Sequence, residues 1–374
     1  MMKVTLGDVC EKGASNIKQS DIANMTGEYP IYGAAGYIGN VDFYHQEKPY
    51  VAIVKDGAGI GRTTLHPAKS SVIGTMQYLL PKDNVLPEYL CYVVRHMHLE
   101  KYFTGATIPH IYFRDYKNEK FNLDSLDKQA EIIEILGKAE SIILKRRKEL
   151  AELDNLIKAR FVEMFGDMYL NTMEWRELHL ETMADIVSGI TKGRKIAGKQ
   201  LTKVPYMAVS NVKDGYIDWT TVKTIEATNQ EINQYRLLPD DVLMTEGGDP
   251  DKLGRGAIIR TPLENCIHQN HIFRVRLDES HILPDYFAEY LKHQRAKRYF
   301  LGCAKQTTGI ASINMKQLKA LPVLLPPLEL QNEFSAFIRQ IDKSKVVESI
   351  HRMNVLFNIT LNGGNRYDIR ANEF

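Results

Sequence analysis

The clearest hydrophobic pattern in the chain is a seven-residue repeat that predicts one long helix over residues 126–165. Five apolar residues share one position of the repeat, namely Leu136, Ile143, Leu150, Ile157 and Met164, and Ile132, Ala139 and Leu153 share a second position. The segment contains no proline and a single glycine, Gly137. Such a repeat is typical of a coiled coil, and about 40 residues rising 1.5 Å each give a rod of roughly 60 Å.

A second long helix is predicted after Pro326 and Pro327, over residues 326–362. Its apolar stripe consists of Leu330, Phe334, Phe337 and Ile341. Two such helices can bury their stripes most simply against each other. Because a whole globular segment lies between them in the chain, we expect an antiparallel pair with globular modules at opposite ends.

The globular segments repeat one another. "LPEYLCYVVRHMHLEKYF" (86–103) aligns without a gap to "LPDYFAEYLKHQRAKRYF" (283–300), and "LDKQAEIIEIL" (126–136) aligns to "LELQNEFSAFI" (328–338). The second spacing is slightly longer, which predicts a short insertion in the second copy near Gln306–Ala311. A duplicated module is the simplest explanation, so we expect a pseudo-twofold repeat.

Each copy also contains a glycine-rich loop that ends in Gly-Arg. The first is "VAIVKDGAGIGRTTLHP" (51–67) and the second is "DVLMTEGGDPDKLGRGAIIRTP" (241–262). In both, an apolar strand precedes the loop and a short apolar or threonine-rich strand follows it. Strands in the modules and long helices after them predict a mixed α+β (α/β) fold for the whole chain.

Composition limits the classes of protein to consider. Of the 374 residues, 44% are hydrophobic and 25% are charged, which is typical of a globular chain, and no segment has the apolar length of a signal peptide or a membrane span. We therefore expect a cytoplasmic protein without a membrane partner. The four cysteines lack C-x-x-C spacing, which argues against a disulfide framework or a thiolate zinc site.

Two enzymatic interpretations of the motifs are weak. A dinucleotide loop needs its glycines before a helix N-terminus, whereas Arg62 is followed by two threonines and, soon after, by Pro67. "CIHQNH" (266–271) offers Cys266, His268 and His271 as metal ligands, but an alternating strand would direct these side chains to both faces. We predict no catalytic residues, no metal and no cofactor bound by this chain.

A nucleic-acid interface fits the loops better. The net charge is only +2, so binding must rest on local cations, such as those of the segment 192–203. Glycine allows close approach to a phosphate backbone, and arginine can bridge phosphates or read guanine. The candidate DNA-binding residues are Lys55, Arg62, Thr63, Thr64, His110, Tyr112, Arg114, Lys117, Arg194, Lys195, Lys252, Arg255, Arg260, Lys305, Gln306, Thr307 and Thr308.

Taken together, these motifs resemble the specificity subunits of type I restriction-modification enzymes. The resemblance rests on "LGDV" (6–9), "DGAGIGR" (56–62), "LGRGA" (253–257), the linker "ARFVEMFGDMYLNTMEWRELHL" (159–180) and "LPVLLPPLELQNEF" (321–334). It implies two target recognition domains and two spacer helices. The boundaries we expect are 1–124 and 167–325 for the domains, 125–166 and 326–362 for the helices, and 363–374 for a polar tail.

The resemblance also implies a function without chemistry of its own. Each domain would read one half of an asymmetric bipartite target in double-stranded DNA, and the helices would set the spacing. Two methyltransferase subunits would dock on the helical region, for which the candidates are Leu136, Ile143, Leu150, Leu153, Ile157, Phe334, Phe337 and Ile341. Restriction (translocase) subunits would join through the methyltransferase core, and S-adenosylmethionine, ATP and Mg would belong to these partners.

Other functions stay open at this point. The chain could be the recognition subunit of a modification-only or phage-defence methyltransferase system, which neighbouring genes would distinguish. A nucleotide-binding enzyme or a coiled-coil scaffold fits less well, because neither accounts for two divergent copies of a cation-bearing loop.

Overall fold

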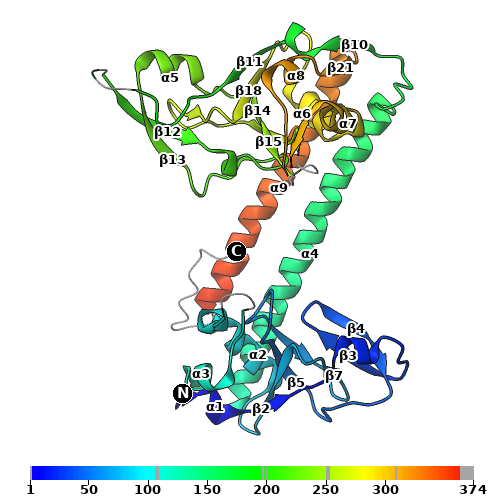
Figure 1. The fold of residues 1–374 in the computed structure, drawn as a ribbon, viewed down its shortest axis with the longest axis vertical. Helices are drawn as coiled ribbons and strands as arrows, with labels where there is room; N and C mark the ends of the chain where they lie inside the picture. Colours follow the sequence, from blue (N-terminus) through cyan, green and yellow to red (C-terminus); the bar gives the residue numbers. More distant parts are fainter. Residues whose placement is uncertain are drawn as a thin grey trace. The chain divides into compact units, whose positions relative to one another are not determined.

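The computed structural model describes residues 2–105, 109–195, 198, 200–249, 253–307 and 310–362, with side chains except at 306, 307, 310 and 346–362 (Figure 1). The chain divides into two compact units, of which Arg146–Val355 forms one and the remaining residues form the other. Both contain sheets and helices, so the predicted mixed α+β fold is confirmed. The candidates Lys252 and Thr308, and the predicted tail, lie outside the described residues.

The main sheet of the first unit is antiparallel, with the strand order β2-β8-β5-β6. Its strands are β2 (Cys10–Ala14), β5 (Tyr50–Val54), β6 (Thr63–His66) and β8 (Met76–Pro81). Every residue of β5 is buried, as expected for a central apolar strand. Helix α2 (Pro87–His96) packs on this sheet through Leu90 and Val94.

Two smaller sheets complete the first unit. The hairpin of β3 (Tyr29–Gly33) and β4 (Gly36–Val41) pairs in parallel with β7 (Ser71–Val72), and β1 (Met2–Thr5) pairs antiparallel with β9 (Lys120–Leu123). The short helical segments are α1 (Leu6–Val9), η1 (Gln19–Ile22), η2 (Leu99–Tyr102) and α3 (Phe113–Tyr116).

The second unit repeats this topology sheet by sheet. Its main sheet has the order β11-β18-β14-β16, formed by β11 (Ala184–Ser188), β14 (Asp241–Thr245), β16 (Gly256–Ile259) and β18 (Ile272–Leu277). Its three-stranded sheet has the order β13-β12-β17, formed by β12 (Thr202–Met207), β13 (Lys223–Ala227) and β17 (Ile267–His268). Its two-stranded sheet pairs β10 (Arg176–His179) with β21 (Pro322–Leu325). The same strand orders and directions confirm the predicted internal repeat.

The second unit also has an additional sheet with the order β15-β20-β19, formed by β15 (Gly247–Gly248), β19 (Lys305–Thr307) and β20 (Ile310–Ser312). In the first unit, single bridges between Asp56 and His110 and between Thr104 and His110 stand in its place. The predicted insertion therefore falls where the second copy extends these bridges into strands. The helical segments of this unit are α5 (Asn229–Tyr235), α6 (Pro284–Lys292), α7 (Gln294–Cys303), α8 (Met315–Lys319), η3 (Leu180–Thr182) and η4 (Val209–Asn211).

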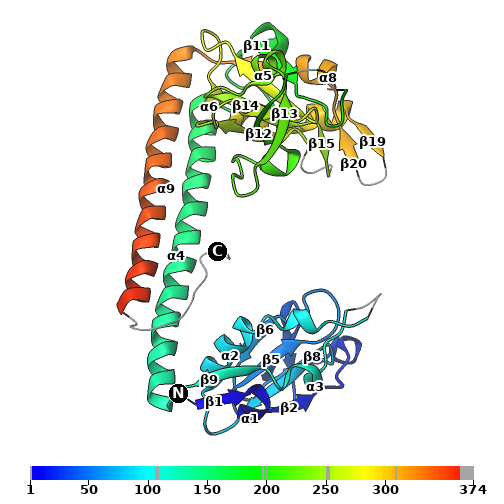
Figure 2. The same ribbon diagram turned by 90° about the vertical axis from the view of Figure 1, so that its left-hand side faces the viewer.

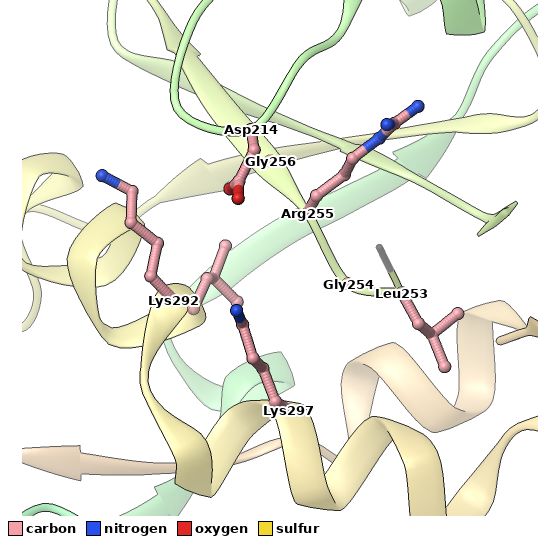
Figure 3. Close-up of a pocket in the computed structure, with 8 residues that line it drawn as sticks. Asp214, Leu253, Gly254, Arg255, Gly256, Lys292 and Lys297 are labelled. Atoms are coloured by element: carbon pink, nitrogen blue, oxygen red, sulfur yellow. The ribbon is translucent and has the colours of Figure 1, made fainter. Parts of the chain in front are cut away.

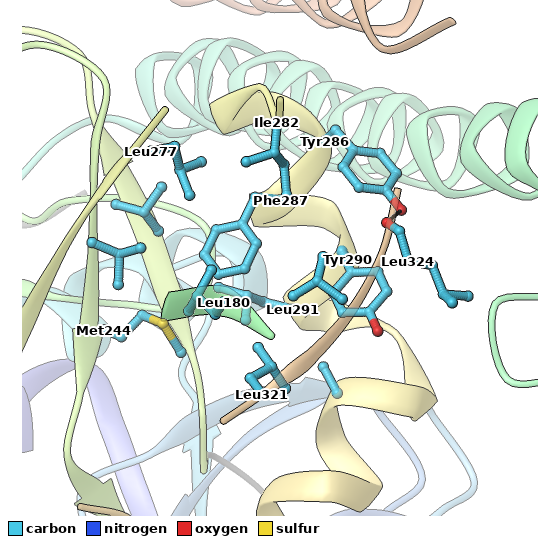
Figure 4. Packing of buried hydrophobic residues seen from close by; sticks show 14 of the residues in the cluster. Leu180, Met244, Leu277, Ile282, Tyr286, Phe287, Tyr290, Leu291, Leu321 and Leu324 are labelled. Atoms are coloured by element: carbon cyan, nitrogen blue, oxygen red, sulfur yellow. Dashed lines mark hydrogen bonds between the residues drawn. The ribbon is translucent and has the colours of Figure 1, made fainter. Parts of the chain in front are cut away.

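The largest hydrophobic core lies in the second unit, where α6 covers the main sheet (Figure 4). Phe287 and Leu291 of α6 face Met244 and Leu277 of the strands, and all four are buried. Beside them, Tyr286 is buried and its hydroxyl donates a hydrogen bond of 2.6 Å to the carbonyl oxygen of Leu324. Burial raises the pKa of Tyr286 far above its ordinary value, so this hydroxyl stays a donor.

The two predicted long helices are present as α4 (Leu126–Phe165) and α9 (Leu328–Asn362). In the second unit they lie side by side and antiparallel (Figure 2). The ring of Phe161 lies 5.4 Å from that of Phe334, and Lys345 donates to Asp154 at 2.7 Å further along both helices. The antiparallel pairing expected from the two stripes is thus found in this unit.

Candidate nucleic-acid interface

The two Gly-Arg loops occupy the same place in the two main sheets. Residues 55–62 connect β5 to β6, and the second loop leaves β14 and enters β16. At the end of the first loop, the carbonyl oxygen of Arg62 accepts a hydrogen bond of 2.9 Å from Val54, the last residue of β5. The carbonyl oxygen of Arg255 accepts the same bond, at 3.2 Å, from Thr245 at the end of β14. The expected strand-loop-strand arrangement is therefore found twice, with the two arginines equivalent.

The exposed Arg62 side chain lies across its own loop. Its Nη1 donates a hydrogen bond of 2.9 Å to the carbonyl oxygen of Ala34, in the turn between β3 and β4. Gly59 has φ +90°, and a Cβ atom there would lie 2.9 Å from Arg62 Nη2. Gly61 has φ +81° and would meet the backbone of Glu100 at 2.7 Å. The glycines thus permit both the backbone conformation and the close packing of the arginine.

Residues 109–114 run alongside the first loop. Gly57 donates its backbone N–H to Pro109 at 2.9 Å, and Ile111 donates to the carbonyl oxygen of Lys55 at 3.0 Å. These bonds bring two of the predicted segments together, although about fifty residues separate them in sequence.

Polar and aromatic side chains form a cluster where residues 109–114 meet the first loop. The carboxylate of Asp56 binds both Lys55 and the Nδ1 atom of His110. The rings of His110 and Tyr112 lie 4.1 Å apart, and the guanidinium carbon of Arg114 lies 4.6 Å above the centre of the Tyr112 ring. Tyr112 and Arg114 are exposed, so this end of the cluster faces solvent, although Arg114 Nε also lies 3.5 Å from a carboxylate oxygen of Asp115. Asp56 was not among the predicted residues, because only the fold places it opposite His110.

Three other candidates of the first unit do not join this cluster. Thr63 is buried and its hydroxyl donates to the carbonyl oxygen of Gly61 at 3.0 Å. The hydroxyl of Thr64 lies 2.7 Å from His66 Nε2, with which it shares a hydrogen bond. Lys117 is exposed at the end of α3, where its carbonyl oxygen accepts a hydrogen bond from Gly7.

In the second unit, Arg255 lines a pocket of about 270 Å³ together with Lys292, Lys297, Asp214 and the backbone of Gly254–Gly256 (Figure 3). Arg255 directs its guanidinium away from Asp214 and the two lysines. Its Nε atom is buried and has no hydrogen-bond partner among the described residues. Three cations and one carboxylate make this surface net positive, although Lys292 also binds Glu289 at 2.8 Å.

Two predicted arginines are held by carboxylates of their own unit. Arg194 contacts both oxygens of Glu231, at 2.5 and 2.9 Å, and donates to the carbonyl oxygen of Glu226 at 2.8 Å. These bonds from Arg194 hold the pKa of Glu231 at about 2, below its ordinary value. Arg260 binds Asp240 and the buried Asp285, at the opposite end of β16 from Arg255. Both arginines contribute to the fold, so charge alone does not identify a DNA contact.

The remaining DNA-binding candidates of the second unit are not among the described residues that line the pocket beside Arg255. Lys195 and Lys305 are exposed. Gln306 and Thr307 belong to β19, of which the structure describes the backbone.

One equivalence between the units was missed by sequence reasoning. Ile111 donates to the carbonyl oxygen of Lys55, and at the same place in the second unit Ile313 donates to that of Glu246, at 2.9 Å. Glu246 also binds His271 Nδ1 at 2.6 Å. One unit therefore has a cation at this position and the other has an anion.

The comparison with protein families decides what these two units are. The family model described as "Type I restriction modification DNA specificity domain" matches residues 1–155 and again residues 173–354. The chain belongs to this family. Each match covers one of the two repeats, in agreement with the duplicated topology.

Individual members of the DNA specificity domain family resemble parts of the chain. The putative type I restriction enzyme MjaX specificity subunit of Methanocaldococcus jannaschii is 28% identical over 45% of this chain and 40% of its own length. The EcoKI specificity subunit of Escherichia coli K12 is 24% identical over 53% of this chain and 42% of its own. The chain thus spans about two fifths of each of these relatives. The MjaVIII specificity subunit of M. jannaschii is 23% identical over 84% of this chain and 78% of its own.

A solved structure shows the same fold over almost the whole chain. The S subunit of a type I restriction-modification system from M. genitalium has a TM-score of 0.57 at 14% identity, covering 96% of this chain and 94% of that one.

The histidines and cysteines of this specificity-domain chain do not gather into a metal centre within the residues that the structure describes. His268 is buried, with its ring nitrogens 3.0 Å from the Tyr235 carbonyl oxygen and 3.3 Å from that of Val187. Burial lowers the pKa of His268 to about 4, so the ring is neutral near pH 7. None of the described helices combines the length and the apolar character needed to cross a membrane.

The apolar stripe assigned to partner binding is largely used inside the chain. Ile157, Phe334 and Ile341 are buried, and Leu153 and Phe337 pack against the same core. Leu136, Ile143 and Leu150 are half-buried. A repeat of apolar positions indicates which face of a helix is buried, but it does not show whether the same chain or a partner subunit buries it. The large apolar side chains that α4 leaves exposed are Leu126, Leu144, Leu156 and Val162, which sequence reasoning did not select.

Proposed function

We propose that this chain is the DNA sequence-specificity subunit of a type I restriction-modification complex, and that each repeat reads one half of an asymmetric bipartite target in double-stranded DNA. One observation carries the proposal: the repeats share one topology but differ in charge at the equivalent positions of Lys55 and Glu246. Related scaffolds with different side chains on the same loop would read different bases, because base edges are recognised by donor and acceptor patterns.

Within each repeat, we assign DNA binding to the edge that carries the Gly-Arg loop. In the first repeat this edge presents Arg62, Tyr112 and Arg114, and in the second it presents Arg255, Lys297 and Lys305. The arginines and lysines among these residues would hold the phosphate backbone and place the loop in a groove. We propose recognition domains at 1–124 and 167–325, with spacer helices at 125–166 and 326–362.

The proposal includes partners that would carry out the chemistry. Two methyltransferase subunits would dock on the helical region, with Leu156 and Val162 as exposed apolar contacts, and restriction subunits would join through them. S-adenosylmethionine, ATP and Mg would be bound by these partners, and the complex would act in the cytoplasm, where its DNA lies.

The test is co-expression with the methyltransferase subunits followed by genome-wide mapping of methylated adenine. We expect one motif with two specified halves and an unspecified gap. Replacing residues 167–325 with the corresponding segment of another family member should change one half and leave the other half and the gap intact. A change in both halves, or methylation without sequence preference, would contradict the proposal.

A further inference from the structure

Each repeat has an exposed tyrosine in the same short sequence motif. The tripeptide Gly-Tyr-Ile occurs at residues 36–38 and again at 215–217. In the first unit the tripeptide begins β4, where Tyr37 pairs with Tyr32 of β3, and in the second it lies between η4 and β13, where Ile217 pairs with Val212. The glycines adopt left-handed conformations, with φ +117° at Gly36 and +82° at Gly215. Tyr37 is 63% exposed and Tyr216 is 60% exposed.

Hydrogen bonds hold the segment around each tyrosine in place. In the second unit, Lys213 donates its N–H to the carbonyl oxygen of Tyr216 at 3.0 Å, and Val212 pairs with Ile217. In the first unit, the hydroxyl of Tyr37 donates to Asn40 Oδ1 at 3.0 Å, and its ring stands edge-on to that of Tyr32 at 6.0 Å. With its hydroxyl engaged, Tyr37 presents mainly the face of its ring.

Each turn also contacts the Gly-Arg loop of its own unit. In the first unit, Ala34 accepts the hydrogen bond from Arg62. In the second, Gly215 donates its N–H to the carbonyl oxygen of Gly256 at 3.0 Å, next to Arg255. The same turn contributes Asp214 to the pocket that Lys292 and Lys297 line (Figure 3). In each repeat, an exposed tyrosine therefore belongs to a segment that contacts the Gly-Arg loop of its own unit.

We propose that Tyr37 and Tyr216 are aromatic contacts to duplex DNA, one for each half of the target. Each ring would enter a groove and pack against sugar and base edges, while the neighbouring cations hold the phosphates. Single exposed apolar residues are common on protein surfaces, but here a Gly-Tyr-Ile motif on a segment that contacts the Gly-Arg loop recurs in both repeats. A ring that packs on sugars and base edges selects no particular base, so a tyrosine can serve two halves of different sequence. The inference rests on the proposed function.

The test uses the chain in complex with its methyltransferase subunits and a duplex that contains the mapped target. The variants are Tyr37→Ala, Tyr37→Phe, Tyr216→Ala and Tyr216→Phe, with 2-aminopurine placed in one half of the target at a time. We expect each alanine variant to bind about tenfold more weakly, each phenylalanine variant to bind within about twofold of wild type, and the salt dependence to stay unchanged, because a ring contact releases no counterions. Tyr37→Ala should alter the 2-aminopurine signal in one half and Tyr216→Ala in the other.

Two exposed apolar residues away from the loops provide matched controls. Met25→Ala in the first unit and Leu170→Ala in the second remove side chains that are 43% and 68% exposed, and both should bind DNA as wild type does. The inference would be overturned if the alanine variants bound DNA normally, or if the phenylalanine variants bound as weakly as the alanine variants. In either case, selective binding by the wild-type complex would still support the proposed function. A wild-type complex that prefers no duplex would overturn both.

Discussion

Gln331 Oε1 accepts a hydrogen bond of 2.8 Å from the backbone N–H of Leu283, the residue that precedes α6. Its Nε2 atom donates to the carbonyl oxygens of Pro326 and His281, at 2.9 and 3.2 Å. In the first unit, Gln129 accepts the same bond from Leu86, which precedes α2, also at 2.8 Å. Both glutamines are fully buried on the first turn of a long helix. Each helix is thus fixed to its unit by one amide that bonds in three directions.

We predict that Gln331→Met lowers the free energy of unfolding by about 1–3 kcal/mol, because the N–H of Leu283 and the carbonyl oxygen of Pro326 lose their partner in a buried place. Urea denaturation measures the change. The neighbouring Asn332 is exposed, so Asn332→Ala is the control and should stay within about 0.5 kcal/mol of wild type. Equal losses in the two variants would show that the buried amide is not the cause.

The loop glycines allow a test of how closely the first Gly-Arg loop packs against Glu100. Gly57 and Gly61 both have positive φ, at +83° and +81°. A Cβ atom at Gly57 meets nothing within 4 Å, whereas at Gly61 it would lie 2.7 Å from the backbone nitrogen of Glu100. Gly57→Ala should therefore cost about 1–2 kcal/mol from backbone strain alone, and Gly61→Ala should cost more. Thermal unfolding of the two variants compares them, and a Gly57→Ala variant at least as destabilised as Gly61→Ala would contradict the packing argument.

Two of the predicted arginines should behave differently because their surroundings differ. Arg62 is exposed and bonds to a backbone carbonyl, whereas Arg260 binds the buried Asp285, whose pKa is raised by burial despite the opposing effect of Arg260. Arg62→Ala should weaken DNA binding by the complex and reduce the slope of its salt dependence by about one if the guanidinium meets a phosphate. Arg260→Ala should instead lower stability by about 1 kcal/mol or more, because a buried carboxylate loses a partner. Binding isotherms at several salt concentrations and urea denaturation separate the two effects, and a reversal of them would show that Arg260 is the DNA contact.

The Arg194–Glu231 pair predicts a dependence of stability on pH. Arg194 holds the pKa of Glu231 at about 2 in the folded chain, against an ordinary value of 4.5. A depressed pKa stabilises the folded state above the unfolded value, and this stabilisation disappears as pH falls toward the folded value. The difference in unfolding free energy between wild type and Glu231→Gln should be constant near pH 7 and shrink between about pH 4.5 and pH 2. A difference that does not change over this range would show that the pair does not stabilise the fold.

The sequence by itself determined the elements and the duplication. The heptad positions of residues 126–165 and the proline pair at 326–327 predicted α4 and α9, because the spacing of apolar residues reflects local helical geometry. The aligned segments 86–103 and 283–300 predicted two copies of one module, which the matching strand orders confirmed. These features are local patterns or repeats in the sequence. They can therefore be recognised without knowing which segments are in contact in the folded chain.

Only the tertiary structure decided which side chains remain available for DNA. Arg194 and Arg260 resemble Arg62 in sequence, but they meet Glu231 and Asp285, which lie 37 and 25 residues away. The equivalence of Lys55 and Glu246 appeared through backbone bonds to Ile111 and Ile313, and Tyr37 and Tyr216 stood out through their exposure beside the arginine loops. The pairing and exposure of these polar side chains depend on contacts between distant segments, which the local spacing of residues does not reveal.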